Sequence, residues 1–337
     1  MKRVVADRFG GPEVLRVIEE PAPRPGPGQA CVEVEAAGAS FTDALVRAGS
    51  YLGGPKAPCT PGYEIVGTVR ETGPGCEALR VGERVAALIV WGGYAEQVCL
   101  AEQSAVPVPE DLDAAQLVGL LLPYMTAYQL LHRAAGANKG ETVLLHGAAG
   151  RVGSAVLELA GPAGLRVIGT ASAEDRARVE RAGALALDYR SRGMARRVRE
   201  LSPAGVDIAL DGIGGAVSLR SYRALGPGGR LVLYGHLSTL SGGRRSPRGW
   251  LEWYAAAAAV EAAGLLAPRR KVLGYRVVQM RDRHPEWFRE DLRELIRLLR
   301  EGTVRPVIAE RMPLTDARRA HEMLESTAAR GKLVLLP

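Results

Sequence analysis

The stretch that decides the fold runs Val143-Leu-Leu-His-Gly-Ala-Ala-Gly-Arg-Val-Gly-Ser-Ala-Val156. An apolar run of strand length leads into Gly147, Gly150 and Gly153, and a helix-like run from Ala155 to Ala160 follows. This layout is typical of a phosphate-binding turn between a first strand and a first helix. Gly147 permits the tight turn, Gly150 lets the backbone approach a pyrophosphate, and Gly153 lets the helix pack closely on the strand. The helix N-terminus then offers N–H groups and a positive dipole end to the phosphates.

The spacing Gly-x-x-Gly-x-x-Gly departs from the usual Gly-x-Gly-x-x-Gly, so the match by itself is equally compatible with a purely structural turn. The surrounding pattern favours the phosphate-binding turn, because strand-like runs alternate with helical ones, as in βαβ units of a parallel sheet. The predicted strands are Leu165–Gly169, Ala184–Leu187, Val206–Leu210, Arg230–Tyr234 and Lys271–Val277. A helix is predicted over Glu174–Ala182, and turns at Asp211–Gly215 and Gly226–Gly229. The middle of the chain is therefore predicted to be a doubly wound dinucleotide-binding domain.

The end of the second predicted strand favours NADPH over NADH. NAD-binding proteins usually have an acidic residue there for the ribose 2′-OH, whereas this chain has Ser172. Arg176 follows one helical turn later, and Tyr189 ends the third strand. A hydroxyl and a guanidinium suit a 2′-phosphate. The alternative is that Arg176 is a solvated surface residue, and the nearby Glu174–Asp175 pair would repel a phosphate that it faced.

Composition excludes several other classes of function. The 337 residues predict two domains, and 47% hydrophobic content is ample for a core. The net charge is +7, but the basic residues are scattered and there are only 3 Phe, so nucleic acid is not expected as a ligand. The longest apolar tract, Trp253–Ala267, contains Glu261 and is too short to span a bilayer.

The four cysteines fit no zinc-binding spacing, and a disulfide framework is not expected in a chain of this length. We therefore expect reduced, mostly packed thiols in a cytoplasmic protein. The N-terminal residues Met1–Ala6 run straight into a strand, with no apolar signal core or cleavage site.

Residues 1 to about 120 follow a different pattern, with short alternating segments separated by Pro/Gly turns. The segments are Ala30–Ala36, Glu64–Glu71, Arg84–Leu88 and Tyr94–Leu100. They predict a small, partly open β-barrel. Later helices at Glu290–Leu299 and from Pro313 return the chain to it. The expected domains are 1–121 with 281–337 for the barrel, and 122–280 for the doubly wound sheet.

This combination resembles the medium-chain dehydrogenase/reductase superfamily, and within it the zinc-free quinone oxidoreductase-like group. The resemblance covers the whole chain and implies a GroES-like barrel plus a Rossmann domain. Its motifs include Gly10–Leu15, Ala37–Asp43, Arg47–Tyr51, Pro61–Gly67, Val81–Val85, Arg319–Glu325 and Arg330–Val334. The long 241–270 segment, with Trp250, Trp253 and Tyr254, is similar to the branch of vesicle amine transport protein 1 homologues. These aromatic residues are expected either to pack a helix or to wall a substrate cleft.

Three departures from the superfamily pattern argue against a metal. Zinc-dependent relatives have Gly-His-Glu where this chain has Gly62-Tyr63-Glu64, and Ser40 stands where they have a catalytic-zinc cysteine. The lobe with four structural cysteines is also missing. A zinc site needs three or four converging nitrogen, sulfur or oxygen ligands. The expectation is an enzyme without zinc.

The resemblance also assigns roles to individual residues. It implies that Tyr51, Ser40 and Thr126 are catalytic, with Tyr51 donating a hydrogen bond to a substrate carbonyl. The substrate cleft would include Asp43, Tyr63 and Tyr124, although each tyrosine could instead be a core ring. The cofactor residues would be Gly147, Gly150, Arg151, Val152, Gly153, Ser172, Arg176, Tyr189, His236 and Lys332. Arg151 could instead be a surface residue, and Lys332 could simply cap a strand.

The function implied is an NADPH-dependent reductase that transfers a hydride to a quinone, enone or enoyl substrate. Two alternatives stay open: a non-catalytic NADPH-binding or scaffold protein of the same fold, and a tailoring enzyme of a biosynthetic pathway. The strand Lys271–Val277 should be the edge of the parallel sheet, and unpaired edges are usually covered or paired. We therefore expect a homodimer that pairs this strand about a two-fold axis.

Overall fold

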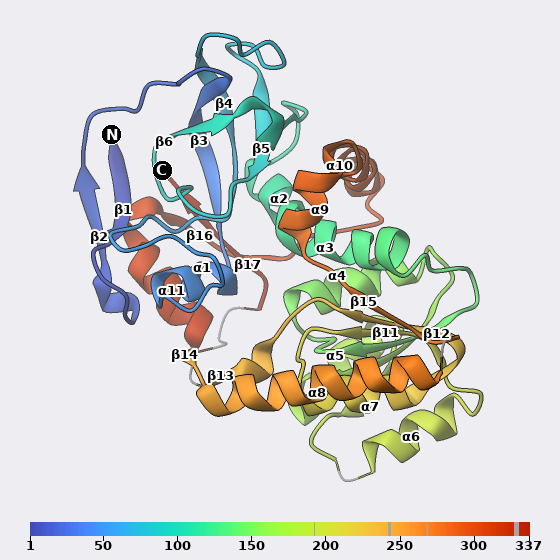
Figure 1. The fold of residues 1–337 in the computed structure, drawn as a ribbon. Coiled ribbons are helices and arrows are strands. Elements are labelled where there is room, and N and C mark those ends of the chain that lie inside the picture. The colour runs from blue at the N-terminus through green and yellow to red at the C-terminus, as the bar shows by residue number, and fades with distance from the viewer. Residues whose placement is uncertain (192, 242–243, 268, 327–329) are drawn as a thin grey trace. The chain divides into compact units, whose positions relative to one another are not determined.

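The structure is a computed structural model that describes residues 1–191, 193–241, 244–267, 269–326 and 330–337. It divides the chain into two compact units (Figure 1). Unit 1 comprises Met1–Leu122, Arg281–Ile296 and Arg305–Pro337, and unit 2 comprises Pro123–Met280 and Arg297–Val304. Residues 297–304, which were expected in the barrel domain, group with unit 2.

Unit 1 is built on a seven-stranded sheet in the order β16-β17-β3-β4-β5-β7, with β6 also paired to β3. Long β3 holds this sheet together, because it pairs with β17, β4 and β6. Val32, Ile65 and Leu333 belong to the core that this sheet encloses. The elements are β1 (Lys2–Ala6), β2 (Leu15–Glu19), β3 (Gln29–Ala39), α1 (Phe41–Arg47), β4 (Glu64–Thr72), β5 (Arg84–Leu88), β6 (Gln97–Ala101), β7 (Ala105–Pro107), α2 (Ala114–Gly119), α10 (Pro285–Arg300), β16 (Ile308–Pro313), α11 (Ala317–Glu325) and β17 (Lys332–Leu336).

Unit 2 is a six-stranded parallel sheet in the order β10-β9-β8-β11-β12-β15. Its strand order reverses next to the first strand, β8, as in a doubly wound fold. The elements are α3 (Met125–Gln129), β8 (Thr142–His146), α4 (Arg151–Ala160), β9 (Arg166–Ala171), α5 (Arg176–Arg181), β10 (Leu185–Asp188), α6 (Met194–Leu201), β11 (Val206–Asp211), α7 (Ala216–Ala224), β12 (Leu225–Leu233), α8 (Pro247–Leu266), β15 (Lys271–Gly274) and α9 (Val277–Arg283). The fold class predicted from the sequence, a GroES-like barrel domain plus a parallel Rossmann-type sheet, is confirmed.

Several predicted boundaries were wrong for identifiable reasons. The edge strand β15 ends at Gly274 rather than Val277, because Val277 already begins α9. The cluster Gly226–Gly229 was expected to be a turn but lies within β12, where the pairing register with β11 shifts. Gly228, at φ +79°, lets the backbone follow that irregularity. The helix after the glycine turn, α4, begins at Arg151 directly after Gly150, whereas the sequence indicated a helical run from Ala155.

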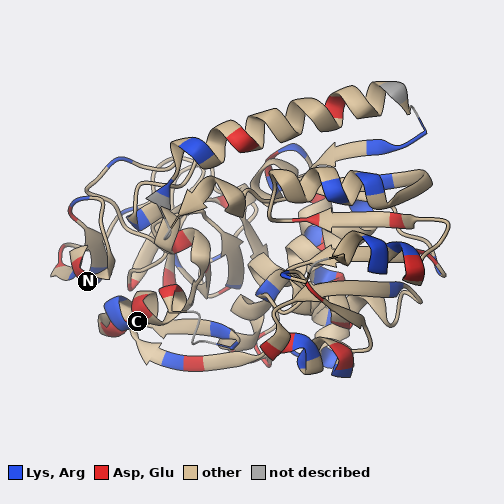
Figure 2. Ribbon diagram, turned by 90° about the horizontal axis from the view of Figure 1, so that it is seen from below, with Lys and Arg blue, Asp and Glu red and all other residues tan. Residues whose placement is uncertain are grey.

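One helical run in the described part of the chain, Ala114–Ala134, has the length and apolar composition of a membrane span. Most of that run is buried within the protein, as in the core helix of a soluble protein. Figure 2 shows Lys and Arg interspersed with Asp and Glu along the ribbon, with no long run of one sign. Part of the 241–270 segment, namely residues 242–243 and 268, lies outside the described residues.

Candidate functional site

The glycine turn of unit 2 lies at the carboxyl end of β8, where open parallel sheets bind ligands. Gly147 has φ +68°, a conformation that L-residues rarely adopt. A Cβ on Gly153 would overlap the carbonyl oxygen of Gly147 and lie 2.7 Å from the carbonyl carbon of Ala148. Only glycine fits at position 153, therefore, and it packs against the turn itself rather than against the strand.

The first turn of α4 presents its backbone N–H groups at the same place. Gly150 is the N-cap residue and has no side-chain cap, and the N–H of Ser154 makes the first helical bond, 2.7 Å to the Gly150 carbonyl. The N–H groups of residues 151–153 lie ahead of that bond, in the turn whose donors an α-helix leaves to outside partners. With the helix dipole, this arrangement suits an anion such as a pyrophosphate.

Two buried side chains hold the turn to the sheet. The Thr170 hydroxyl at the end of β9 is 3.4 Å from the Gly147 nitrogen and 3.2 Å from His146 Nδ1. His146 Nε2 lies 2.9 Å from the Ser221 hydroxyl on α7, so both ring nitrogens have partners. Burial lowers the pKa of His146, which keeps the ring neutral. His146 is therefore an organiser of the turn.

The residues after β9 have partners that the sequence did not predict. The Ser172 hydroxyl donates to Asp175 at 3.1 Å, and Arg176 forms a 3.4 Å ion pair with Glu180 on the surface of α5. The arginine that reaches the glycine turn is Arg178, whose guanidinium donates to the Ala149 carbonyl. Its Nε is buried without a hydrogen-bond partner among the described residues. The sequence analysis did not single out Arg178. Its position two residues after Arg176, on the same short helix, could have marked it as a second candidate.

Tyr189 lies beside Ser172, because its N–H donates to the Ala171 carbonyl at 3.2 Å. The Tyr189 ring is largely exposed, and the Arg190 guanidinium stands 5.2 Å from its centroid. Arg190 Nε also donates to the Tyr189 hydroxyl at 3.1 Å. A second arginine that was not expected thus stands at this corner of the sheet.

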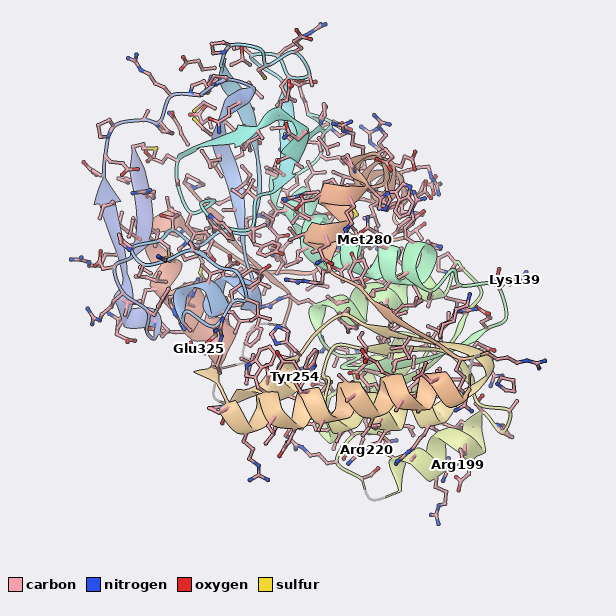
Figure 3. All side chains as sticks on the ribbon, in the orientation of Figure 1. Lys139, Arg199, Arg220, Tyr254, Met280 and Glu325 are labelled. Atoms are coloured by element: carbon pink, nitrogen blue, oxygen red, sulfur yellow. The ribbon has the colours of Figure 1, made fainter. Side chains whose placement is uncertain are left out.

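His236 follows β12 at the same edge of the sheet as the glycine turn, since all six strands are parallel. Its Nδ1 lies 3.0 Å from the Thr239 hydroxyl, and its ring is 5.6 Å from Trp250. Burial lowers the pKa of His236. Trp250 also contacts Trp253, which packs against the backbone of Gly214. This packing accounts for part of the aromatic group, while Tyr254, labelled in Figure 3, is exposed.

Two predicted site residues of unit 2 lie on the helical run Ala114–Ala134, in the part that follows Leu122. The Tyr124 hydroxyl donates to Glu158 on α4 at 2.8 Å, and burial raises its pKa. The structure therefore gives Tyr124 a partner inside unit 2. Thr126 is buried on α3.

In unit 1 two predicted residues are brought into contact. The hydroxyls of Tyr51 and Tyr63 are 3.1 Å apart, with the rings in an edge-to-face arrangement. Tyr63 is buried and Tyr51 is half-buried. Burial strongly raises the pKa of Tyr63, so its hydroxyl keeps its proton. A protonated hydroxyl behind Tyr51 can donate to it and hold it in one orientation.

Ser40 and Asp43 form the capping box of α1. Asp43 Oδ2 accepts from the Ser40 N–H at 2.8 Å and from its hydroxyl at 2.7 Å, while Oδ1 accepts from the Gly62 N–H at 2.9 Å. The Ser40 hydroxyl also lies 2.5 Å from that of Thr42, a neighbour that the sequence analysis did not single out. Asp43 therefore fixes both the start of α1 and the glycine that precedes Tyr63.

Lys332, a predicted cofactor residue, forms a buried ion pair with Glu64 in unit 1. The other Glu64 oxygen accepts from the Leu122 N–H at 2.7 Å. A Cβ on Gly38 would lie 2.5 Å from Lys332 Cε, so glycine makes room for the pair. Burial lowers the pKa of Lys332 to about 8, and the charge of Asp43 opposes that shift. In the structure, therefore, Lys332 at the start of β17 is paired with Glu64 at the start of β4.

Tyr63 and Ser40 stand at the two positions compared above with the zinc ligands of other dehydrogenases. Tyr63 is hydrogen-bonded to Tyr51, and Ser40 belongs to the capping box. Neither group offers the nitrogen or thiolate ligand that zinc prefers. Within the described ranges, no three His, Cys, Asp or Glu side chains come together.

Comparisons with known proteins cover both units. Residues 26–110 match the alcohol dehydrogenase GroES-like domain, and residues 182–335 match a family described as zinc-binding dehydrogenase. The rat synaptic vesicle membrane protein VAT-1 homologue (Rattus norvegicus) is 31% identical over 100% of this chain and 84% of its own length. Rat quinone oxidoreductase is 30% identical over 100% of this chain and 98% of its own.

Solved structures agree with these relatives. A mycobacterial protein solved in complex with NADPH is 33% identical, with a TM-score of 0.82 and full coverage of both chains. A quinone oxidoreductase of Pseudomonas syringae pv. tomato is 28% identical, with a TM-score of 0.85 over 100% of this chain and 99% of that one. The barrel, the parallel sheet with its glycine turn and these full-length similarities lead to one assignment. The chain belongs to the medium-chain dehydrogenase/reductase superfamily of oxidoreductases, in its quinone oxidoreductase-like group.

Proposed function

We propose that this protein is a zinc-independent reductase that binds NADPH and reduces a quinone, an enone or an enoyl substrate. The observation that carries the proposal is the glycine turn of unit 2, where α4 aims its first N–H groups and Arg178 reaches the turn. The similarity to a mycobacterial protein solved with NADPH supports the same cofactor. When bound, NADPH supplies the hydride.

The cofactor would be held in two places. Its pyrophosphate would accept hydrogen bonds from the N–H groups of residues 151–153, because these donors precede the helical ladder. Its 2′-phosphate would lie near Ser172, Arg176 and Tyr189, at the ends of β9 and β10. Arg190 adds a further positive charge beside Tyr189. Guanidinium and hydroxyl groups are the kinds of donor that bind a phosphomonoester.

Two arginine variants test this assignment. Arg176→Ala should cost about 1.5–3 kcal/mol of NADPH binding, or roughly tenfold to a hundredfold in Kd, with little change for NADH. Arg178→Ala should weaken both cofactors, because Arg178 contacts the turn at Ala149 rather than a group unique to NADPH. Arg181→Ala, on the exposed face of α5, is the matched control. Equal weakening of both cofactors by Arg176→Ala, measured by fluorescence titration, would show that the 2′-phosphate site lies elsewhere.

Tyr51 is the group proposed to act on the substrate. Its hydroxyl would donate to the substrate carbonyl and stabilise the enolate oxygen that forms when hydride reaches the β-carbon. The contact with Tyr63 supports this role, because a protonated Tyr63 can orient the Tyr51 hydroxyl. Ser40 and Thr126 would position the nicotinamide end of the cofactor by resemblance to the family.

A substrate panel tests the reaction. Quinones, 2-enones and enoyl thioesters are each mixed with the protein and NADPH, and oxidation of NADPH is followed by absorbance. Turnover of one class identifies the substrate type. Tight NADPH binding without turnover of any class would favour the alternative, a cofactor-binding scaffold. Full metal analysis of the active protein, together with activity after chelation, tests the independence from zinc.

We also propose a homodimer in the cytoplasm. β15 stands at one edge of the parallel sheet, and the Tyr275 N–H donates to Leu233 on β12. Since donors alternate along a strand, the Gly274 N–H points away from β12. Gly274→Pro would remove that outward donor, while Gly274→Ala, in open space, would keep it. Light scattering should show dimers for Gly274→Ala and fewer for Gly274→Pro; a monomeric parent protein would contradict the proposal.

A further inference from the structure

Two of the four cysteines face each other across adjacent strands of unit 1. Cys31 on β3 is the direct partner of Cys99 on β6 in an antiparallel pair. The sequence separates these residues widely, so no local motif marks them. Both are present as free thiols, and each influences the pKa of the other. Directly opposed residues of an antiparallel pair point to the same face of the sheet, so the two side chains are near neighbours.

The hydrogen-bond ladder places this pair in the favourable register for a cross-strand bond. The Val34 N–H donates to Glu96 at 2.9 Å, and the Glu102 N–H donates to Gly28 at 3.1 Å. Hydrogen-bonded and non-hydrogen-bonded pairs alternate along an antiparallel ladder. Cys31 and Cys99 lie three positions from each of those bonded pairs, so they form a non-hydrogen-bonded pair. Such pairs hold their Cα atoms about 4.5 Å apart, which lies within the range of disulfides.

The surroundings of the two thiols differ. Cys31 is 2% exposed and its sulfur contacts the Pro23 carbonyl at 3.7 Å, so the preceding proline-rich segment covers it. Cys99 is half-buried and lines a surface pocket of about 270 Å³ with Trp91 and Arg281. A small reagent in that pocket would lie beside Cys99, whereas Cys31 is covered. The pair thus has an accessible member and a shielded one.

We propose that Cys31 and Cys99 form a reversible redox site that closes a cross-strand disulfide when a low-molecular-weight disulfide such as oxidised glutathione reacts with it. The Cys99 thiolate attacks one glutathione sulfur, which forms a mixed disulfide and releases one glutathione thiolate. Cys31 then attacks the Cys99 sulfur and expels the second glutathione. Two protein thiols lose two electrons and two protons, and one glutathione disulfide becomes two glutathione thiols.

The rate of closure should increase with pH. The thiolate is the attacking species, and burial raises the pKa of both thiols, that of Cys99 to about 12. Glu71 on β4 opposes thiolate formation at both sulfurs, and Arg281 is a positively charged residue that lines the same pocket as Cys99. The site should therefore resist oxidation at neutral pH and close faster in mildly alkaline buffer.

The test uses the full chain carrying Cys76→Ser, which removes the other partly exposed thiol. The protein is incubated with oxidised glutathione, denatured, alkylated, and measured by intact mass and peptide mapping. We expect two of the three remaining thiols to resist alkylation and a single linked peptide to join Cys31 to Cys99. Alkylation of all three thiols, or a bond to Cys59 or to a second chain, would overturn the proposal.

Single variants test the order of attack. Adding Cys31→Ser should trap one glutathione on Cys99, because no second thiol is present to expel it. Adding Cys99→Ser should leave Cys31 unmodified, because Cys31 is shielded. Cys59→Ser is the matched control and should close the disulfide as the parent does. A stable adduct on Cys31 in the Cys99→Ser chain would contradict the assigned roles. Circular dichroism of each variant shows that the fold is retained.

Discussion

The two candidate regions are built from different polar groups. In unit 1, charged side chains far apart in the sequence meet: Lys332 pairs with Glu64 in the core, and buried Arg47 contacts His321 and the exposed Glu325, the latter labelled in Figure 3. In unit 2, the glycine turn presents backbone N–H groups, and the buried carboxylate at the end of β11 is satisfied by near neighbours. This carboxylate, Asp211, accepts from the N–H groups of Ile213 and Gly214 and from the Ser218 hydroxyl.

This difference explains why the two candidate regions were not equally visible in the sequence. A site made of backbone groups needs glycines at a fixed spacing before the start of a helix. This pattern lies within a few consecutive residues, so it is visible in the sequence. A site made of long-range side-chain pairs needs the whole barrel to close before its partners meet. Three predictions follow from the comparison.

The largest effect is expected from breaking the buried ion pair of unit 1. Lys332→Met leaves Glu64 charged and unpaired in the core, which should cost about 3–5 kcal/mol of unfolding free energy. Adding Glu64→Gln removes the orphan charge while keeping an acceptor for the Leu122 N–H, so stability should partly return. Urea unfolding measures both changes.

Lys56→Met, at an exposed position of the same unit, is the control and should be nearly neutral. If Lys332→Met is equally neutral, the ion pair makes no net contribution to the free energy of unfolding. The two units would then differ in where their polar groups lie but not in how much those groups stabilise the fold.

A smaller effect is expected from adding one methyl group to the backbone site of unit 2. In Gly153→Ala the new Cβ meets backbone atoms of Gly147 and Ala148, which cannot move independently of the turn. The expected cost is about 1–3 kcal/mol in stability, together with a marked loss of NADPH binding. The readouts are urea unfolding and cofactor fluorescence.

Gly161→Ala provides the matched control, because Gly161 caps the other end of α4 in open space with φ −58°. It should be neutral or slightly stabilising. Normal cofactor binding by Gly153→Ala would mean that the turn is not the phosphate site.

The effect that is smallest at neutral pH concerns the acid side of the stability curve. Burial and the charge of Arg47 lower the pKa of His321 from 6.5 to about 3. As pH falls from 6.5 toward 3, the unfolded chain binds a proton at this residue and the folded chain does not, so stability falls. The contribution is about 1.4 kcal/mol per pH unit in that window and vanishes above pH 6.5.

His321→Asn keeps an acceptor for Arg47 but cannot titrate. The difference in unfolding free energy between the parent protein and this variant should therefore change with pH below 6.5 and be constant above it. His284→Asn, at a partly exposed position of unit 1, is the control. A difference that does not depend on pH would show that His321 titrates alike in both states.

Much of the fold could be predicted from the sequence because its signals are local. The turn glycines, the strand runs around them and the Pro/Gly-punctuated segments of the barrel each lie within a short window, and together they indicated both the parallel sheet and the barrel. The boundaries were less certain where local signals conflict. Gly226–Gly229 has turn composition, yet the pairing of β11 with β12 holds it within a strand. Val277 is β-branched and ends the predicted strand, yet it begins α9.

The candidate site divides in the same way. The sequence determined that Gly147, Gly150 and Gly153 mark the turn into α4 and its first helical turn, because φ, steric room and helix geometry depend on neighbours along the chain. Only the tertiary structure decided that Arg178 reaches that turn, that Tyr63 contacts Tyr51, that Lys332 pairs with Glu64 and that Cys31 faces Cys99. Each of these contacts depends on how strands and helices pack, and a side chain's partner across that packing leaves no periodic or spacing signal in the sequence.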